Sequence, residues 1–536
     1  MTPPGTPPSF ADAWLRRGFA FAVLAFVWWR MSENTADNDL WGHVLYGQRM
    51  LHLGRLETIE TLSWTAAGQP WLNHEVLAEI ALGLTHRLAG STGLWSLMMI
   101  MAGVTLGWAW HEGAGTDRGR RITGLGLLAL ATNCIALGYA VRPQLFTYLF
   151  FVALLVALRR FFAGRIGWGL AIPALLIVWA NTHGGFLAGW IIALVALFGE
   201  TIAGLFPTLL QRLRCEPLQK RPGPGAAALL AIAATLALLV NPWGWKLVLW
   251  TCATLVLPRP HIFEWQPMPL TTGSLPFFFV VVLGIAAWGL SRQPRRIWEI
   301  ATWSLLAAVA IKAQRHAPLF GLASMVFLPV HLQDLLARLS PHAASLRDLF
   351  RRPAVALGSA LALFLAGGQC LHASTAGRAY PWRMEVPRTF FPVAAIEFMK
   401  AHHLTGNTIT FFDWGQQVLW ELPDNPVSFD GRLDTVYPLR VMDAHWALYA
   451  GQDPAPYLDV SKAEVALLPT GGEGYPWLKR HGWKVAYCDS LATVLTRTPV
   501  LPRPGFGSVE DVTGSVPFPD APPVLATRAA RTSPAP

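Results

Sequence analysis

The sequence predicts an all-α polytopic membrane protein with a small α/β domain at its C-terminal end. Hydrophobic residues make up 53% of its 536 residues, and charged residues only 14%. Soluble domains carry about 25% charged residues, so the chain lacks the surface charge that water requires. Its mean hydropathy of +0.38 agrees. So do the 25 Trp residues, because Trp gathers at membrane interfaces.

Apolar runs predict the membrane-spanning helices. A spanning helix needs about 20 mainly apolar residues, and about eleven runs approach that length. One further apolar stretch, residues 74–90, is interpreted as an amphipathic helix on the outer surface, within a long first outer loop at 32–91. If this stretch crossed the membrane, every later loop would lie on the opposite side, and the basic loops would be outside. The predicted spans cover residues 14–31, 92–110, 121–140, 143–159, 166–182, 184–206, 225–241, 273–290, 297–313, 316–332 and 353–370.

Basic residues fix the predicted orientation. Lys and Arg cluster in every second loop, which is typical of cytoplasmic loops. The N-terminus is therefore predicted inside and the C-terminal domain outside. The net charge of +10 is explained by these loops, so no nucleic-acid partner is expected. The predicted domains are a disordered cytoplasmic arm (1–13), a transmembrane module (14–370), an extracytoplasmic α/β domain (371–498) and a disordered tail (499–536).

The α/β domain is predicted from strands that alternate with helices. Cys370 and Cys488 both fall in predicted outer segments, where a disulfide can form, although their spacing does not fix a pairing. Helices are predicted near 391–403, 415–421 and 437–449, and strands near 407–412, 426–429, 463–469, 483–489 and 492–498.

The first outer loop holds the most informative polar residues. Asp37 and Asp39 follow the first span, and His43 lies four residues after Asp39. If a helix begins near Asp39, then Asp39 and His43 share one face. Such a carboxylate can act as a general base or hold a divalent cation. The alternative is that Asp37 or Asp39 only caps the helix.

Other polar residues lie at the predicted outer ends of helices. Their cations suit a phosphate or pyrophosphate group, although a single Lys or Arg there can also be a snorkelling residue. In the C-terminal domain, Asp413, Asp430 and Arg432 are interpreted as ordinary turn residues. No P-loop, G-x-S-x-G, HExxH or CxxC motif is present. The outer residues are His74 and Glu75, which follow Asn73 in the first loop, and Arg142, His183, Lys312, Arg315 and His316.

Residues 14–370 resemble the GT-C superfamily of membrane glycosyltransferases. This group includes the protein O-mannosyltransferases, the aminoarabinose lipid A transferases and the Rgt-type glycosyltransferases. The likeness rests on the long acidic first outer loop, where "DNDLWGHVLYGQRMLHLG" is followed by "GQPWLNHEVLAEIAL". One departure is that Asn38 splits the adjacent acidic pair of that group.

The resemblance implies an inverting glycosyltransferase of a bacterial inner membrane. It would move a sugar from a polyprenyl-phosphate donor to a glycan, lipid or protein acceptor on the outer face. Asp39 would be the first choice for the general base, and Asp37 the second. Either residue could instead help to hold a divalent cation, which is the one cofactor that the resemblance suggests. Two alternatives are a non-catalytic scaffold whose outer domain binds a partner, and a lipid or glycan transporter. The expected substrate-binding residues are His43, His74, Glu75, Arg142, His183, Lys312, Arg315 and His316.

Overall fold

The computed structural model describes residues 10–204, 223–255, 257–340, 352–500 and 512–521, together with residues 206, 208, 215 and 349. Contacts between Cα atoms divide the chain into two compact units. The helical unit comprises Met1–Glu33, Met98–Ala140 and Gln144–Pro381. The α/β unit comprises Asn34–Leu97, Val141–Pro143 and Trp382–Pro536. The predicted first outer loop therefore groups with the C-terminal domain.

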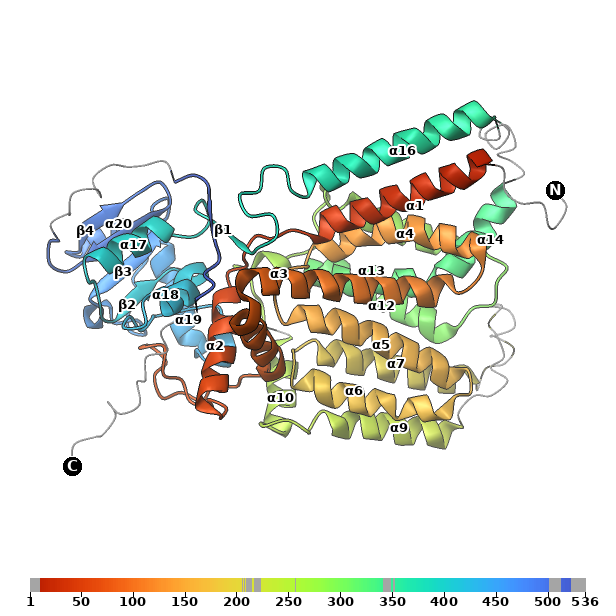
Figure 1. The fold of residues 1–536 in the computed structure, drawn as a ribbon. Coiled ribbons are helices and arrows are strands. Elements are labelled where there is room, and N and C mark those ends of the chain that lie inside the picture. Colours follow the sequence, from red (N-terminus) through yellow and green to blue (C-terminus); the bar gives the residue numbers. More distant parts are fainter. Residues whose placement is uncertain are drawn as a thin grey trace. The chain divides into compact units, whose positions relative to one another are not determined.

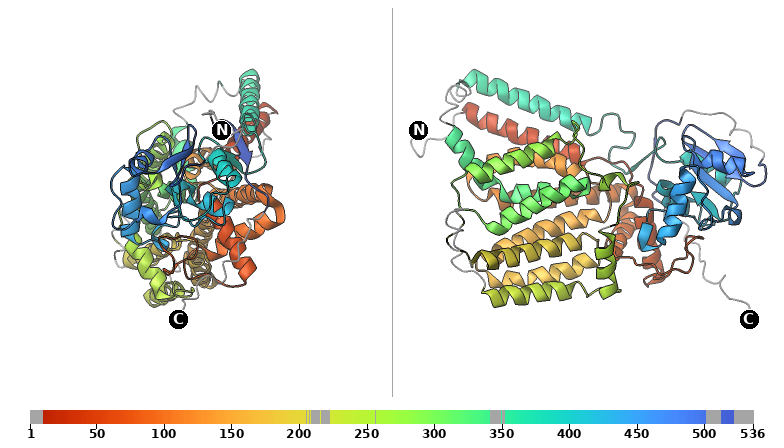
Figure 2. Two further views of the ribbon diagram at one scale, coloured as in Figure 1. Left: turned by 90° about the vertical axis from the view of Figure 1, so that its left-hand side faces the viewer. Right: turned by 180° about the vertical axis from the view of Figure 1, so that it is seen from behind.

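The helical unit is built from the apolar runs of the sequence. Each of the predicted spans falls on a helix of the structure (Figure 1). Helices α1 and α16 lie side by side along their length, and two views agree on this (Figure 2). The helices of this unit are α1 (Phe10–Met31), the second part of α3 (Val76–Ala114), α4 (Arg118–Ala136), α5 (Gln144–Phe162), α6 (Ala171–Ala180), α7 (Phe186–Gly204), α9 (Pro224–Ala237), α10 (Trp245–Thr254), α11 (Leu275–Leu290), α12 (Ile297–Lys312), α13 (Ala317–Phe327), α14 (Pro329–Leu339) and α16 (Pro353–Ala373).

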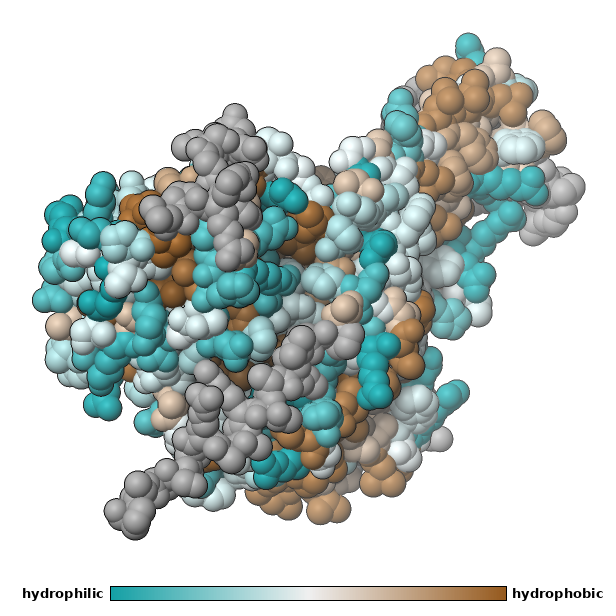
Figure 3. Space-filling view, turned by 60° about the vertical axis from the view of Figure 1, so that its left-hand side comes forward, coloured by the Kyte–Doolittle hydropathy of each residue, from teal (hydrophilic) through white to brown (hydrophobic). Residues whose placement is uncertain are grey.

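Not every helix is long enough to cross a bilayer on its own. Within the described residues, α3, α5 and α16 meet the length and composition of a span. Residues Gln314–Phe327 and Pro329–Leu339 form a fourth candidate, bent by 60° at the proline that interrupts it. The eleven spans thus stay a prediction. Large hydrophobic side chains such as Ile232, Val282 and Leu361 nevertheless remain exposed, and hydrophobic surface is extensive in Figure 3.

Helix α3 is broken at Gly90, between the predicted surface helix and the predicted span. Gly90 has φ 58° and ψ −150°, a conformation that favours glycine. Asp520 caps the helix that restarts there, since its Oδ1 accepts from both the backbone N and the Oγ of Ser91, each at 2.8 Å. The sequence signal at 74–90 therefore marks a separate helical segment.

The α/β unit contains a four-stranded mixed sheet in the order β2-β3-β5-β4. Strands β2 and β3 run parallel, and the other two pairs are antiparallel. Apolar residues of the strands and of α19 and α20 form its core, including Ile409, Leu448 and Leu478. The elements of this unit are α2 (Leu40–Leu53), the first part of α3, β1 (Glu385–Pro387), α17 (Val393–Ala401), β2 (Thr408–Thr410), α18 (Gly415–Glu421), α19 (Leu439–Tyr449), β3 (Val465–Pro469), α20 (Gly474–Arg480), β4 (Lys484–Cys488), β5 (Ala492–Thr496) and β6 (Ser515–Pro517).

Three details differ from the sequence prediction or extend it. The segment predicted as a strand at 426–429 forms only single-residue bridges, in which Val427 pairs with both Ser63 and Thr408. Part of the tail predicted to be disordered is ordered, because β6 pairs antiparallel with β1. Residues 501–511 and 522–536 of that tail, and the N-terminal arm up to residue 9, lie outside the described residues. The structure describes all five cysteines, and none of them, Cys370 and Cys488 included, forms a disulfide.

Candidate active site

The acidic loop lies at the start of α2. Asp37 caps the turn, because its Oδ1 accepts from the backbone N of Asp39 at 2.9 Å. Asp39 occupies the N-cap position of α2, but its side chain makes no capping hydrogen bond. Asp37 therefore acts in part as a cap, which was one of the two alternatives. Asp39 makes no capping bond, and its carboxylate lies beside Arg142.

Arg142 joins the two carboxylates. Its Nε is ion-paired with Asp37 Oδ1, and its Nη2 lies 3.1 Å from Asp39 Oδ2. The side chains of Arg142 and Asp37 are each 19% exposed, and that of Asp39 is 27% exposed. Two neighbouring carboxylates repel each other, and the positive charge of Arg142 offsets this repulsion. The more exposed of the two, Asp39, is the one that a substrate can reach more easily.

The C-terminal part of the chain closes around this loop. Gln416 Oε1 accepts from the backbone N of Gly42 at 3.1 Å. The backbone of Gly431 approaches Asp39 so closely that a Cβ there would lie 2.0 Å from Asp39 Oδ1. Burial raises the pKa of Asp413, although a hydrogen bond from Asn38 opposes this effect, and the charge of Asp37 adds to it. The "FDWGQQ" and "FDGRLD" segments thus contribute to the site as well as forming turns.

A second group of polar residues lies one helical turn further along α2. His43 Nδ1 is 3.7 Å from Glu75 Oε2 and 3.5 Å from Glu79 Oε1. His43 is 8% exposed and Glu79 is 2% exposed. Burial lowers the pKa of His43, but the carboxylates of Glu79, Glu75 and Asp39 outweigh burial and raise it to about 9. Burial raises the pKa of Glu75 to about 7, against the charge of His43.

Helix packing and one side-chain amide position these groups. The helices α2 and α3 approach closely where Gly47 meets Gly83, and a Cβ on Gly47 would lie 1.8 Å from the Glu79 carbonyl oxygen. That approach places His43, one turn before Gly47, against Glu79. Asn73 Nδ2 donates to Glu79 Oε2 at 2.6 Å, and Asn73 Oδ1 accepts from the backbone N of Glu75 at 2.9 Å. His74 Nε2 lies 3.8 Å from the other oxygen of Glu75, Oε1.

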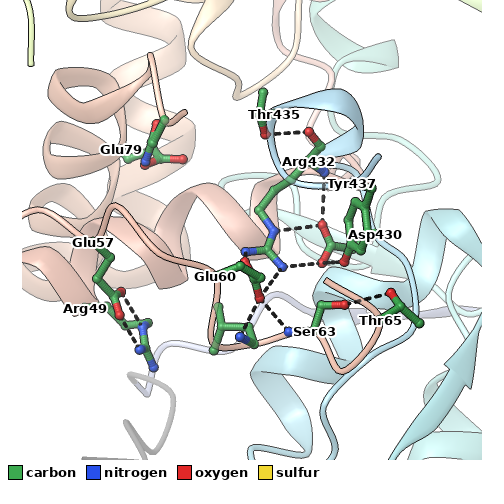
Figure 4. Close-up of polar contacts among 12 residues, drawn as sticks. Arg49, Glu57, Glu60, Ser63, Thr65, Glu79, Asp430, Arg432, Thr435 and Tyr437 are labelled. Carbon is green, nitrogen blue, oxygen red and sulfur yellow. Dashed lines mark hydrogen bonds and ion pairs between the residues drawn. The ribbon is translucent and has the colours of Figure 1, made fainter. Parts of the chain in front are cut away.

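A third group, centred on Arg432, is buried, because the side chains of Arg432, Glu60 and Asp430 are at most 4% exposed. Figure 4 shows its polar contacts. Arg432 Nε and Nη2 bind the two carboxylate oxygens of Asp430 at 2.9 and 2.7 Å. Its Nη1 is ion-paired with Glu60, and its guanidinium also stacks on Tyr46 and Trp71. Tyr437 Oη donates to Asp430 Oδ2 at 2.9 Å. This cluster ties the first loop to the C-terminal domain and leaves its ionic partners satisfied.

The structure brings together part of the predicted site. Asp37, Asp39 and Arg142 meet in the α/β unit, and His43, His74 and Glu75 form the neighbouring group. The other predicted residues belong to the helical unit. There, Arg315 lies 3.2 Å from Glu264 and stacks on Trp265, and His183 Nδ1 bonds Thr147 Oγ1 at 2.8 Å. Lys312 ends α12 with an exposed side chain, and His316 ends the short helical turn Gln314–His316.

Sequence reasoning missed several residues of these groups. Glu79 was available from the sequence, since it follows Glu75 by four residues and such pairs share a helix face. Asn73 was visible only as part of a polar triplet. Gln416 had no sequence signal, because its contact with Gly42 spans 374 residues. Asp413 had been interpreted only as a turn residue.

Comparisons with known proteins bear on the fold. No protein-family model matches the chain, and a search of curated proteins finds no match. Among solved structures, the apo oligosaccharyltransferase of Archaeoglobus fulgidus aligns with a TM-score of 0.52 at 13% identity, covering 90% of this chain and 74% of that chain. The chain shares the fold of this oligosaccharyltransferase.

A second solved structure extends along a similar share of the chain. It is ArnT from Cupriavidus metallidurans bound to undecaprenyl phosphate, with 14% identity and a TM-score of 0.47, covering 91% of this chain and 98% of that chain. The fold and the apolar helices together identify a multi-pass membrane protein. The resemblance found in the sequence is thus confirmed at the level of the fold.

Proposed function

We propose that the protein is a membrane glycosyltransferase that moves a sugar from a polyprenyl-phosphate donor to an acceptor on the outer face of the membrane. The observation that carries this proposal is the Asp37–Arg142–Asp39 group, in which one cation holds two carboxylates at the start of α2. The shared fold supports the reaction class. The alternating basic loops support the outer face.

Asp39 is the proposed general base. Its carboxylate is the more exposed of the pair and accepts no capping bond, whereas Asp37 is engaged by the Asp39 backbone and by Arg142 Nε. In the reaction, Asp39 takes the proton from the acceptor hydroxyl. The acceptor oxygen forms a bond to the anomeric carbon while the bond from that carbon to the phosphate oxygen breaks. Polyprenyl phosphate leaves with the electron pair, and a single displacement inverts the anomeric carbon.

Arg142 is the proposed positioning residue. Its guanidinium, 3.1 Å from Asp39 Oδ2, holds Asp39 in one orientation. A guanidinium also suits a phosphate oxygen of the donor. Lys312, Arg315, His183 and His316 remain proposed phosphate-side residues of the helical unit, on the basis of their charge and hydrogen-bonding groups.

The test is transfer by membranes that contain the full-length Asp39→Asn variant. The assay supplies a radiolabelled extract of polyprenyl-phosphate sugars and follows the release of free polyprenyl phosphate with transfer of label. Loss of a general base lowers a rate by about 10²–10⁴-fold, and we expect a decrease of that size. The substitution preserves the shape of the side chain, so expression and thermal stability should stay near those of the wild type.

The matched control is Asp443→Asn, an exposed acid on α19 of the same unit. This variant should transfer label at the wild-type rate. Wild-type transfer by Asp39→Asn at equal expression would rule out the assigned base. Absence of transfer by the wild-type protein, with binding of a partner by the C-terminal domain, would favour a scaffold instead.

A further inference from the structure

We propose that His43, Glu75 and Glu79 form a binding site for one divalent transition-metal ion, with zinc as the first choice. Their ligand atoms, one from each residue, all lie within 4.8 Å of one another. This group is distinct from the Asp37–Arg142–Asp39 group, and none of its acids is the proposed base. The proposal concerns ion binding and does not depend on the proposed reaction.

The distances fit a coordination sphere. Zinc binds imidazole nitrogen and carboxylate oxygen at about 2.0–2.2 Å, which separates two tetrahedral ligands by about 3.4 Å. The separations from His43 Nδ1 are 3.5 Å to Glu79 Oε1 and 3.7 Å to Glu75 Oε2. Small movements of the side chains would therefore bring all three atoms into bonding distance of one ion.

His43 supplies an independent observation. Its Nδ1 is buried, and among the described residues this atom has no hydrogen-bond partner. Buried polar atoms are normally hydrogen-bonded, so one that faces two carboxylates without such a bond needs an explanation. A metal ion that replaces the proton on this nitrogen provides it, and the ion then takes over from the imidazolium in offsetting the two carboxylates.

The surrounding contacts orient the carboxylates. Asn73 donates to Glu79 Oε2, which leaves Oε1 directed at His43. His74 lies nearest to Glu75 Oε1, which leaves Oε2 on the side of His43. Outer contacts of this kind fix the ligands of metal sites and tune their affinity.

The donor set indicates the class of ion. Imidazole suits zinc and its transition-metal neighbours, whereas magnesium and calcium prefer oxygen ligands alone. Three protein ligands leave a fourth position for water or substrate, as in catalytic zinc sites. The backbone N of His43 donates to the carbonyl oxygen of Asp39 at 3.0 Å, so the ion would lie one helical turn from the proposed base.

The experiment measures metal content, not only activity. Full-length protein in detergent is stripped with a chelator, dialysed, and titrated with Zn²⁺ and, separately, with Mn²⁺ against a fluorescent competitor. We expect one equivalent of Zn²⁺ or Mn²⁺ per chain. Substitution of Co²⁺ should add visible absorption bands that report its ligands. Glu79→Gln and His43→Ala should abolish stoichiometric binding and these bands.

The matched control is His52→Ala, which removes an exposed histidine from the same helix and should leave binding unchanged. Asp39→Asn should lose transfer and keep the ion, which separates failure of this site from failure of the proposed function. Absence of stoichiometric binding by folded wild-type protein overturns the proposal, and so does equal binding by folded Glu79→Gln.

Discussion

The cluster around Arg432 and the cluster around His43 lie in the same unit and use the same chemistry, a cationic side chain between two carboxylates. Arg432 binds Asp430 through two N–H groups and pairs with Glu60, and Tyr437 adds a further donor. His43 instead stands 3.5 and 3.7 Å from its two carboxylates without a hydrogen bond at Nδ1. The Arg432 cluster has hydrogen bonds for its charged groups, whereas the His43 cluster lacks one at Nδ1.

The difference separates stability from function. A buried polar network whose members are all satisfied fixes one conformation, and a partly satisfied network is costly unless something completes it. The Arg432 cluster completes itself and holds the first loop on the C-terminal domain. The His43 cluster is the place where a metal ion, in exchange for the imidazole proton, would complete the polar contacts. Three substitutions in this unit test that contrast.

The largest effect on stability is expected for Arg432→Met. The substitution leaves Glu60 and Asp430 buried beside each other without a cation, and breaking such an ion pair costs about 3–5 kcal/mol. Hydrogen exchange of amides in the α/β unit should report that loss of protection in full-length protein. Unchanged protection would show that the cluster does not hold the unit together.

An intermediate effect is expected for Asn73→Ala. The variant removes the amide that holds Glu79 and the oxygen that accepts from the backbone N of Glu75 just before α3. Loss of an intramolecular hydrogen bond costs about 0.5–1.5 kcal/mol. The effect of the variant on metal affinity should be larger, a decrease of about 10–100-fold. Zn²⁺ titration of the variant checks this. If affinity falls only as much as stability predicts, Asn73 has no separate role in orienting Glu79.

The smallest effect is expected for Glu57→Gln. Glu57 accepts two bonds from Arg49, at 2.8 and 2.6 Å, but both side chains keep some contact with solvent. Partly exposed pairs contribute about 0.2–1 kcal/mol, and Zn²⁺ binding should not change. A loss of stability as large as that of Arg432→Met would show that enclosure does not explain the difference between the clusters.

Much of the fold could be predicted from the sequence. A long apolar run predicts a membrane helix without knowledge of its neighbours, because a helix satisfies its backbone hydrogen bonds within itself. Most elements of the α/β domain were also predicted from local patterns. The bridges at Val427 and the strand β6 were not predicted, since each depends on a partner distant in sequence. The break at Gly90 depends in the same way on Asp520.

The candidate site could be predicted only in its local part. Asp39 and His43 lie one turn apart at the start of α2, as expected from their spacing. Arg142 was predicted as a phosphate ligand by its charge, and nothing in the sequence indicated that it would join Asp37 and Asp39. Asp39 contacts Gly431, and Gly42 contacts Gln416, so both contacts join residues far apart in the sequence. Local sequence patterns therefore do not predict them.

The closure of the first loop by the C-terminal domain also determines when the site exists. During synthesis, Asp37, Asp39 and His43 leave the ribosome early, and Gln416 follows Gly42 by 374 residues. Glu60 likewise cannot contact Arg432 until that residue, 372 positions later, has been synthesised. Domains generally fold as units as the chain emerges, but this unit is interrupted by the whole helical segment. The contacts around the acidic loop therefore form only after residues 416–432 have been synthesised.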